Sequence, residues 1–488
     1  MKLLDILENI EYKQVIGSTA INIASFSQDS RDENLADGLY VAVPGTQVDG
    51  HDFISDAINK GAVAVVCERL PELATESDVI FVVVEDARKA LGTIASNFYQ
   101  NPTKELTVIA VTGTNGKTSV VHYFGQVLCK LGHKPLVLST AGDSFAGTVI
   151  DIDRKAPSSL EVIELNRVAR KYLDQGATHL LIEATSQALD QHRLSGVDIN
   201  AGIFTNLDQD HLDYHKTFEH YAESKKLLFD GLESTALAIS NFDDDYGAYM
   251  LADTPAQKIS YGSDSMYNYS FNVTATDLGS IEVEFNQSTV VLPVIGGFNV
   301  YNALAVYAAL VELGFEEKNI FHGLEGLTGV PGRMEQILNN HNVLAVVDYA
   351  HSPGALVSVL ETLRALPHER IITVIGCGGD RDRTKRAPMT EVTQRLSDYV
   401  IYTADNPRTE DLDQIFSDMR NGIDSTRENF TFIHSREEAI AEAVNQSQPN
   451  DIILVAGKGH EDYQIIGTEK HHFNDREQLD NYLNLKTL

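Results

Sequence analysis

The chain contains few cysteines and no long apolar run, and both shortages exclude classes of protein. Only three of its 488 residues are cysteine, and Cys67, Cys129 and Cys377 lie far apart. An odd number of widely spaced cysteines provides neither a disulfide framework nor a zinc cluster, so we expect a reducing, cytoplasmic location. No apolar run approaches the roughly 18 residues of a membrane-spanning helix, and we expect no membrane association. Residues 1–10 carry acidic side chains and predict an amphipathic helix, not a signal peptide.

Positive charge is also scarce. The chain has 38 Lys and Arg against 70 Asp and Glu, which gives a formal net charge of −32. Because a nucleic-acid-binding protein presents a basic face and none is visible here, we expect no nucleic-acid partner. An acidic enzyme can still bind phosphates in a locally basic cleft. One run of four cations is a candidate for such a cleft, and its members are Arg381, Arg383, Lys385 and Arg386.

Length predicts about three domains, because a single hydrophobic core does not serve 488 residues. Residues 1–103 hold short apolar strands between helical stretches, which predicts a small α/β domain. The segment Asn101-Pro-Thr-Lys104 is a predicted linker, and Gly329-Val-Pro-Gly332 marks a second boundary. The predicted domains are therefore residues 1–103, 104–331 and 332–488.

The last domain shows apolar strands that each run into a polar loop. Helical segments separate them, and Ser352 before Pro353 is typical of an N-cap followed by the first helical turn. This alternation predicts a parallel, doubly wound sheet, with ligands beyond the carboxyl ends of its strands. The predicted strands are 343–347, 371–375, 399–403 and 452–455.

The most informative local pattern is Val111-Thr-Gly-Thr-Asn-Gly-Lys-Thr118, which follows an apolar strand and precedes a helical pattern. Gly113 and Gly116 let the backbone turn its N–H groups toward anionic oxygens. Lys117 and Thr118 then suit the phosphates and a Mg²⁺ ion of a nucleotide. The spacing is two residues shorter than the common pattern, and an ordinary tight turn is the alternative. The predicted ATP-binding residues of this loop are Gly113, Thr114, Asn115, Gly116, Lys117, Thr118 and Ser119.

Eight short motifs, in the same order along essentially the whole chain, resemble those of the Mur ligases. The resemblance implies an α/β fold of three domains: a UDP-binding α/β domain, a P-loop ATPase-like domain and a C-terminal Rossmann-like domain that binds the amino acid. It implies an ATP-dependent ligase in which a substrate carboxylate becomes an acyl phosphate that an amine then attacks. The motifs are Asp29–Arg31, Thr112–Thr118, Phe204–His215, Gly332-Arg333, Asp348–His351, Gly376–Asp382, Asp405–Arg408 and Gly457–Glu461.

The resemblance places the catalytic machinery around Lys117 and one or two Mg²⁺ ions. Thr118, Glu183 and His211 would supply a hydroxyl, a carboxylate and an imidazole to the metal. In the family, the lysine that matches Lys225 is carbamylated, which turns a donor into a carboxylate ligand. The alternatives are a solvated strand end for Glu183, a packed loop residue for His211 and a solvated helix face for Lys225.

Further nucleotide and substrate contacts are implied by the same resemblance. Asn302, Arg333 and Asp348 match positions that hold adenine, phosphates and ribose; an interdomain salt bridge is the alternative for Arg333. The UDP-linked substrate would lie along the first two domains. Its predicted contacts are Ser30, Arg31, Thr46, Gln47, Ser158, Ser159, Thr185, Gln191 and Arg193.

The motif Asp405-Asn-Pro-Arg408 is similar to that of members that add meso-diaminopimelate to UDP-N-acetylmuramoyl-L-alanyl-D-glutamate in peptidoglycan synthesis. Diaminopimelate differs from lysine by a second carboxylate, which a guanidinium binds in a bidentate manner. A pocket built for that carboxylate rejects lysine. A surface loop arginine is the alternative for Arg408. The predicted amino-acid pocket comprises Arg381, Asp405, Asn406, Pro407, Arg408, Gly457 and Glu461.

The chain departs from the family pattern where the UDP-linked substrate should bind. Glu183-Ala-Thr-Ser-Gln187 stands for the usual Glu-Val-Ser-Ser-His, and Pro157-Ser-Ser159 stands for Asn-Thr-Thr. The alternatives are therefore a paralogue that acts on a modified precursor, a ligase of the folylpolyglutamate synthase type, a silent precursor-binding protein and a nucleotide-hydrolysing switch. We expect a monomer.

Overall fold

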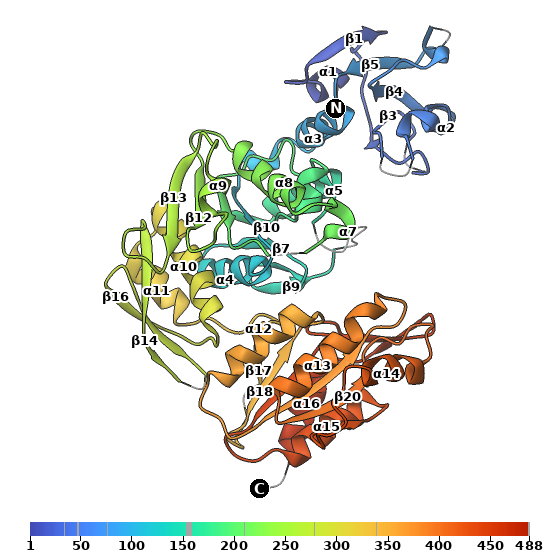
Figure 1. The fold of residues 1–488 in the computed structure, drawn as a ribbon. Coiled ribbons are helices and arrows are strands. Elements are labelled where there is room, and N and C mark those ends of the chain that lie inside the picture. The colour runs from blue at the N-terminus through green and yellow to red at the C-terminus, as the bar shows by residue number, and fades with distance from the viewer. Residues whose placement is uncertain are drawn as a thin grey trace. The chain divides into compact units, whose positions relative to one another are not determined.

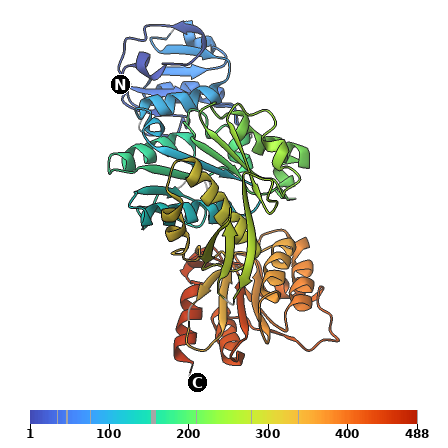
Figure 2. The ribbon, with the colours of Figure 1, turned by 90° about the vertical axis from the view of Figure 1, so that its left-hand side faces the viewer.

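The computed structural model describes residues 1–33, 35–45, 48–75, 77–152, 159–208, 210–277, 279–337 and 339–486, without the side chains of Thr75, Leu212 and Asp213. The chain divides into two compact units. The first comprises residues 1–262 and 308–315, and the second comprises residues 263–307 and 316–488. Figure 1 shows the ribbon and its labels, and Figure 2 gives a second view.

A five-stranded sheet forms the N-terminal part of the first unit. The strands expected in this region are present, and their neighbours are parallel except for the antiparallel pair β1–β5. The predicted N-terminal helix is a single turn that ends at Ile6. The strand order is β1 (Tyr12–Ile16), β5 (Ile80–Val84), β4 (Ala62–Cys67), β3 (Gly38–Val41) and β2 (Phe26–Ser27), and the helices are α1 (Leu3–Ile6), η1 (Gly50–Phe53), α2 (Ile54–Asn59), η2 (Glu72–Thr75) and α3 (Ala87–Phe98).

The segment predicted as a linker, residues 101–104, makes contacts with the first unit. It contains the 3₁₀ turn η3 (Pro102–Lys104), in which Pro102 and Thr103 are buried. The Thr103 hydroxyl donates to Asp198 Oδ2 over 3.0 Å. Helix α3 packs closely on the chain nearby, since a Cβ at Gly92 would lie 2.3 Å from the Ser195 carbonyl oxygen. These contacts hold the N-terminal sheet to the rest of the first unit.

A mostly parallel sheet forms the rest of the first unit, with β6 (Thr107–Thr112) between β10 (His179–Glu183) and β11 (Ala201–Phe204). All three strands are parallel, so their carboxyl ends meet at one edge. The remaining strands are β7 (Pro135–Leu138), β8 (Asp143–Phe145), β9 (Thr148–Ile150), β12 (Leu237–Asn241) and β13 (Gln257–Gly262), of which β8 and β9 pair antiparallel.

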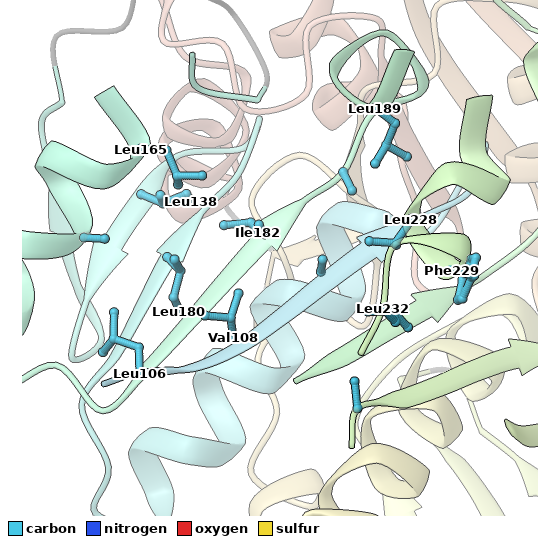
Figure 3. Packing of buried hydrophobic residues seen from close by; sticks show 14 of the residues in the cluster. Leu106, Val108, Leu138, Leu165, Leu180, Ile182, Leu189, Leu228, Phe229 and Leu232 are labelled. Atoms are coloured by element: carbon cyan, nitrogen blue, oxygen red, sulfur yellow. The ribbon is translucent and has the colours of Figure 1, made fainter. Parts of the chain in front are cut away.

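Helices cover both faces of this sheet. On one face Val108, Leu180 and Ile182 pack against residues of α5 (Val162–Leu173) and α8 (Phe218–Asp230), as Figure 3 shows. On the other face lies α4 (Lys117–Lys130), where a Cβ at Gly125 would touch Val137 and Leu181. The predicted apolar face of α4 is buried from Val120 to Leu128. The short helices of this unit are α6 (Ser186–Asp190), α7 (Leu212–His215) and α9 (Gly247–Met250).

The second unit begins with a stretch rich in β-strands. Strands β14 (Tyr269–Thr276), β15 (Ile281–Phe285) and β16 (Ser288–Leu292) pair antiparallel. Helix α10 (Gly297–Glu312) follows, and then α11 (Glu317–Leu324). Among the described residues, we find no helix with the length and hydrophobicity of a membrane span.

The C-terminal part of the second unit is the expected doubly wound sheet. Its neighbours are parallel except for the pair β17–β18, and buried clusters lie on both faces. Ser352 caps the helix that Pro353 opens, as predicted. The strand order is β17 (Glu335–Ile337), β18 (Leu344–Asp348), β22 (Ile452–Ala456), β19 (Ile371–Cys377), β20 (Tyr399–Ala404) and β21 (Phe430–Phe432), with α12 (Pro353–Arg364), η4 (Arg383–Lys385), α13 (Arg386–Leu396), α14 (Leu412–Arg420), α15 (Arg436–Gln446) and α16 (Asp475–Leu485).

A hairpin near the predicted amino-acid pocket is among the elements that the sequence does not predict. Strands β23 (Tyr463–Ile466) and β24 (Glu469–His472) form an antiparallel hairpin after β22. Its burial pattern is half-buried to exposed, without the alternation that identifies a strand from sequence. The hairpin bonds to the loop at 405–408, which is where the sequence predicts the amino-acid pocket.

Candidate active site

The phosphate loop joins the end of β6 to the start of α4. Gly113 has φ 147° and Gly116 has φ 85°, so both adopt backbone conformations that side chains disfavour. A Cβ at Gly113 would also lie 1.9 Å from the Thr205 hydroxyl. The loop is fixed against the end of β11, because the amide of Thr114 donates to the Asn206 carbonyl over 2.8 Å and the Thr205 hydroxyl donates to the Asn115 carbonyl over 2.6 Å. The geometry is that of an anion-binding loop at a helix N-terminus.

Lys117 folds over this loop. Its Nζ donates to the Gly113 carbonyl over 2.9 Å and to the Thr114 carbonyl over 2.8 Å. The ammonium therefore sits beside the backbone that would contact a phosphate. Ser119, the last predicted member of the loop, is buried in the first turn of α4.

Behind the loop, the buried carboxylate of Glu183 accepts hydrogen bonds from uncharged groups. Its Oε1 accepts from the Thr118 hydroxyl over 2.9 Å, from the Thr140 amide over 2.9 Å and from the Thr140 hydroxyl over 3.1 Å. Glu183 is only 3% exposed. Among the described residues it forms no ion pair. A solvated strand end is therefore excluded, and a buried carboxylate that pairs with no cation among the described residues fits a bound metal ion.

His211 lies on the loop after β11, with a left-handed φ of 53° and a side chain that is 48% exposed. The alternative of a packed loop residue therefore does not apply. Its Nε2 is 3.6 Å from Asp210 Oδ2. Among the described residues there is no cluster of three or more His, Cys, Asp or Glu side chains that could hold a metal. Of the four predicted metal ligands only Glu183 and His211 are of these residue types, so the predicted site would not form such a cluster. That both residues bind one metal ion therefore stays a prediction.

Lys225 projects from α8 to the same loop. It is 1% exposed, which excludes the solvated helix face, and its Nζ donates to the Gly113 carbonyl over 2.7 Å. Burial, with a further contribution from the charge of Lys117, lowers the pKa of Lys225 well below its usual value, although Asp210 opposes this shift. A neutral amine is the form that reacts with CO₂, so this environment suits a carbamate.

Four predicted contacts of the UDP-linked substrate form one hydrogen-bonded group beside Glu183. The Ser159 hydroxyl donates to the Glu183 carbonyl over 2.8 Å and lies 3.1 Å from the Thr185 hydroxyl. Arg193 donates to the Ser159 carbonyl over 3.2 Å and to Gln191 Oε1 over 2.7 Å. The structure therefore brings these residues together next to the phosphate loop.

The other predicted contacts of this substrate are less defined. Arg31 is mostly exposed and makes two 2.9 Å bonds to Asp29, while Ser30 beside it is buried. Thr46, Gln47 and Ser158 lie outside the described residues.

In the second unit, Arg333 and Asp348 lie near each other. The Arg333 guanidinium stacks 5.0 Å from the ring centre of Tyr349, and its buried Nε has no hydrogen-bond partner among the described residues. Nor does Arg333 form an ion pair within that part of the chain, so the alternative of a salt bridge is not observed. Burial raises the pKa of the Asp348 carboxyl, against the charge of Arg333, and its oxygens accept two backbone bonds of 2.8 Å. Asn302 is buried in α10, where it donates to Asn299.

The predicted amino-acid pocket is built by the loops after β20 and β22. Asn406 is buried and connects them: its Nδ2 donates to Glu461 Oε2 over 2.8 Å, and its Oδ1 accepts from the Ile465 amide over 2.8 Å. Pro407 is buried next to it. Gly457 has φ 112°, and a Cβ there would lie 2.9 Å from Asp405 Oδ2. The two loops therefore approach each other closely.

The side chains of Arg408 and Arg381 both lie close to Gly378. A Cβ at Gly378 would lie 3.1 Å from Arg408 Nη1, 3.6 Å from Arg381 Cγ and 3.9 Å from Asp405 Oδ1. Arg408 is half-buried, with φ 52°, and its Nη1 donates to the Gly379 carbonyl over 2.8 Å. Two backbone bonds tie it to the β23–β24 hairpin. It is therefore a fixed residue and not the free surface arginine of the alternative.

Two of the four cations in the run predicted as a basic cleft, residues 381–386, are paired with acids. Arg386 is fully buried and makes ion pairs of 2.6 Å with Glu410 and 2.8 Å with Asp418. Arg383 pairs with Asp418 over 2.8 Å. Acids from the segment around α14 therefore neutralise two of the four cations, Arg383 and Arg386, and a count of charges along the run does not include these acids.

Sequence analysis missed the buried groups that support the predicted pocket. Arg436 and Asp475 are both buried and paired over 2.7 Å. The Arg436 guanidinium also donates to the carbonyls of Ala404 and Ala456, the last residues of β20 and β22. It thus joins the two strand ends from which the pocket loops start. No local pattern distinguishes it from the many surface arginines of helix N-termini.

The chain matches known proteins along its whole length. Three family models apply: the catalytic domain of the Mur ligase family at residues 29–99, the Mur ligase middle domain at 111–310 and the glutamate ligase domain of Mur ligases at 332–459. Two relatives named UDP-N-acetylmuramoyl-L-alanyl-D-glutamate–2,6-diaminopimelate ligase are 38% identical over 478 residues, in Cytophaga hutchinsonii, and 40% identical over 482 residues, in Parabacteroides distasonis; each alignment covers 98% of both chains.

A solved structure of a ligase with the same name is 33% identical to the chain, with a TM-score of 0.74 over 99% of both chains. The three-domain α/β fold that the sequence predicts is therefore confirmed. Similarity of this extent, in sequence and in structure, places the chain in the Mur ligase family.

Proposed function

We propose that this chain is an ATP-dependent ligase that adds meso-diaminopimelate to UDP-N-acetylmuramoyl-L-alanyl-D-glutamate in peptidoglycan synthesis. The observation that carries the proposal is its end-to-end similarity to diaminopimelate ligases, together with the loop Asp405–Arg408 that is fixed beside Glu461. The carboxylate of the UDP-linked dipeptide and the amine of diaminopimelate are the two groups that the reaction joins.

The first step is phosphoryl transfer to the carboxylate. A carboxylate oxygen attacks the γ-phosphorus of ATP, the bond to the bridging oxygen breaks, and ADP leaves with that electron pair. Catalysis of this step depends on positioning and on charge neutralisation. The N–H groups of residues 113–119 would hold the phosphates, and Lys117 would neutralise the oxygens of the transferred group. Asn302, Arg333 and Asp348 would hold the rest of the nucleotide.

A divalent cation fits the residues behind the phosphate loop. Glu183 is buried, and the donors that it meets in the described part of the chain are neutral, with the Thr118 hydroxyl at 2.9 Å. Thr118, Glu183, His211 and Lys225 as a carbamate would hold Mg²⁺. When bound, the ion would neutralise the phosphate oxygens as charge develops on them.

The second step forms the amide bond. The diaminopimelate amine attacks the acyl carbon, and phosphate leaves with the electrons of the carbon–oxygen bond. The chain's contribution is to position the amino acid: Glu461 would hold an ammonium group, and Arg408 with Arg381 would hold the second carboxylate. Lysine lacks that carboxylate and would leave the guanidinium without a partner, at a large cost in binding. Ser159, Thr185, Gln191 and Arg193 would hold the dipeptide end of the UDP-linked substrate.

The test is an assay of the full chain with ATP, Mg²⁺ and the UDP-linked dipeptide, with diaminopimelate or lysine. We expect ADP release and a product of the correct mass with diaminopimelate, and a rate at least about 100-fold lower with lysine. Lys117→Ala should abolish both. Release of ADP without any amino acid, or preference for lysine, would contradict the proposal. The monomeric state remains a prediction that light scattering of the same preparation would check.

A further inference from the structure

Lys458 is a fully buried lysine inside the predicted amino-acid pocket. Its side chain has 0% exposure, and it lies on the loop that follows β22. The Nζ atom is 3.0 Å from Glu461 Oε2, donates to the Tyr463 carbonyl and lies 5.4 Å from the centre of the Tyr463 ring. An ammonium that is removed from water must be compensated by such partners. Glu461 is its anionic partner.

Lys458 and Asn406 act on the same atom of Glu461. Lys458 Nζ and Asn406 Nδ2 both bind Oε2, at 3.0 and 2.8 Å. Both donors are themselves fixed, since Asn406 is bound by the Ile465 amide and Lys458 by Tyr463. The carboxylate is therefore held in one orientation through one oxygen, and Oε1 remains available, among the described residues, to a further donor. The Glu461 side chain is 17% exposed, so such a donor can reach it from outside.

Stability alone gives no reason for an ammonium at this place. An apolar side chain of similar length in a buried site is often as stable as a buried ion pair or more so. The pair therefore points to a need for a Glu461 carboxylate that is held in one orientation. The amino group of an incoming amino acid is a cation, and a carboxylate binds it best when it is ionised and immobile before the ligand arrives.

We propose that Lys458 is a positioning residue for the amino-acid substrate, which holds the Glu461 carboxylate in one orientation and directs its Oε1 atom to the substrate ammonium group. The inference rests on the role proposed above for Glu461. Lys458 does not touch the substrate itself, and it acts through Glu461.

The test measures kcat and the KM of each substrate for the full chain and for Lys458→Met, Glu461→Gln and the double variant. We expect Lys458→Met to raise the KM for diaminopimelate about tenfold or more, as for the loss of a charge-assisted hydrogen bond. The KM values for ATP and the UDP-linked dipeptide should stay within about twofold. In the Glu461→Gln background, Lys458→Met should change the KM for diaminopimelate very little further. Lys458 acts on the substrate through the Glu461 carboxylate, which this background lacks.

Two further variants serve as controls. Lys486→Met removes another lysine of the same domain, which binds Val444 and Ser447, and should leave all KM values unchanged. If thermal melting shows that Lys458→Met is unfolded, Lys458→Gln takes its place, since it retains a hydrogen-bond donor without the charge. We expect it to raise the KM for diaminopimelate as well.

Other outcomes contradict the inference in distinct ways. Additive effects of Lys458→Met and Glu461→Gln, or an equal rise of the KM for all three substrates, would overturn it and leave the proposed function intact. A diaminopimelate KM that does not respond to Glu461→Gln would instead refute the role assigned to Glu461 in the proposed function.

Discussion

At the scale of single residues, two carboxylates differ in what compensates their charge. Glu183 is buried among neutral hydroxyl and amide donors, whereas Glu461 is held by the ammonium of Lys458. A buried carboxylate that lacks a cation attracts one, and here the phosphate loop beside it suggests a metal ion. A carboxylate that is already paired through one oxygen suits a second, weaker partner such as a substrate ammonium group. Similar side chains therefore predict different ligands because their immediate neighbours differ.

Arg408 provides the test of substrate choice at this scale. Its guanidinium is held by the Gly379 carbonyl and lies beside Arg381 at Gly378. Substitution of Arg408 by Met should raise the KM for diaminopimelate about 100-fold, because a carboxylate loses a charge-assisted partner. Lysine, which has no second carboxylate, should lose little, so the ratio of kcat/KM values for the two amino acids should fall sharply.

Arg420→Met is the matched control for this experiment. Arg420 belongs to the same domain and stacks on Phe432, at 3.9 Å from the ring centre. The ratio of the two kcat/KM values should remain that of the parent chain. An unchanged ratio in Arg408→Met would show that the selectivity for diaminopimelate lies elsewhere.

At the scale of elements, the sequence predicts best those turns, helices and strands whose own residues determine their conformation. The turn at residues 113–118 needs glycines, and its flanking strand and helix have clear apolar periods, so the whole element is predictable. The β23–β24 hairpin has no such pattern, because bonds from residues 405–408 stabilise it. Lys458 is also invisible to sequence analysis, since a lysine in a loop is normally solvated. Its burial depends on tertiary contacts with Tyr463 and Glu461.

The start of β10 gives a prediction for stability. His179 is buried, and burial, with the nearby His133, lowers its pKa to about 4. Its pKa in the unfolded chain is higher, near 6.5, so the unfolded state binds the proton more strongly. The free energy of unfolding should therefore fall as the pH is lowered from about 6.5 to about 4, by up to ~3 kcal/mol from this group.

Substitution of His179 by Phe removes this titration and retains an aromatic ring beside Phe315, whose ring centre is 6.2 Å away. Urea unfolding at several pH values should give a flatter acid branch than in the parent chain. His434→Phe, at an exposed position, controls for the added phenyl ring. An equally steep branch in both variants would mean that other groups cause the acid sensitivity.

At the scale of the whole molecule, the predicted active-site residues fall in both compact units. The phosphate loop, Glu183 and Lys225 belong to the first, and Asn302, Arg333, Asp348 and the amino-acid pocket belong to the second. Each unit has its own buried clusters. The sequence predicts a domain boundary near residue 331, whereas the compact units divide the chain at residue 262 and return to the first unit for residues 308–315. The division at residue 262 reflects contacts between residues that are far apart in the sequence, and the composition of a linker does not reveal such contacts.

Excision of residues 332–488 tests the predicted boundary. Helices of this segment cover both faces of its sheet, and among the described residues its two buried clusters include only Ile295 from outside the segment. Because it can bury its core by itself, the fragment should be folded and melt cooperatively, with a loss of stability of about 1–2 kcal/mol for the missing side chain. Circular dichroism and urea unfolding would measure this, with residues 263–488 as the matched longer fragment. If only the longer fragment folds, the sheet and helices after residue 332 depend on β14–β16 and α10, and the boundary of the folding unit lies near residue 262 instead.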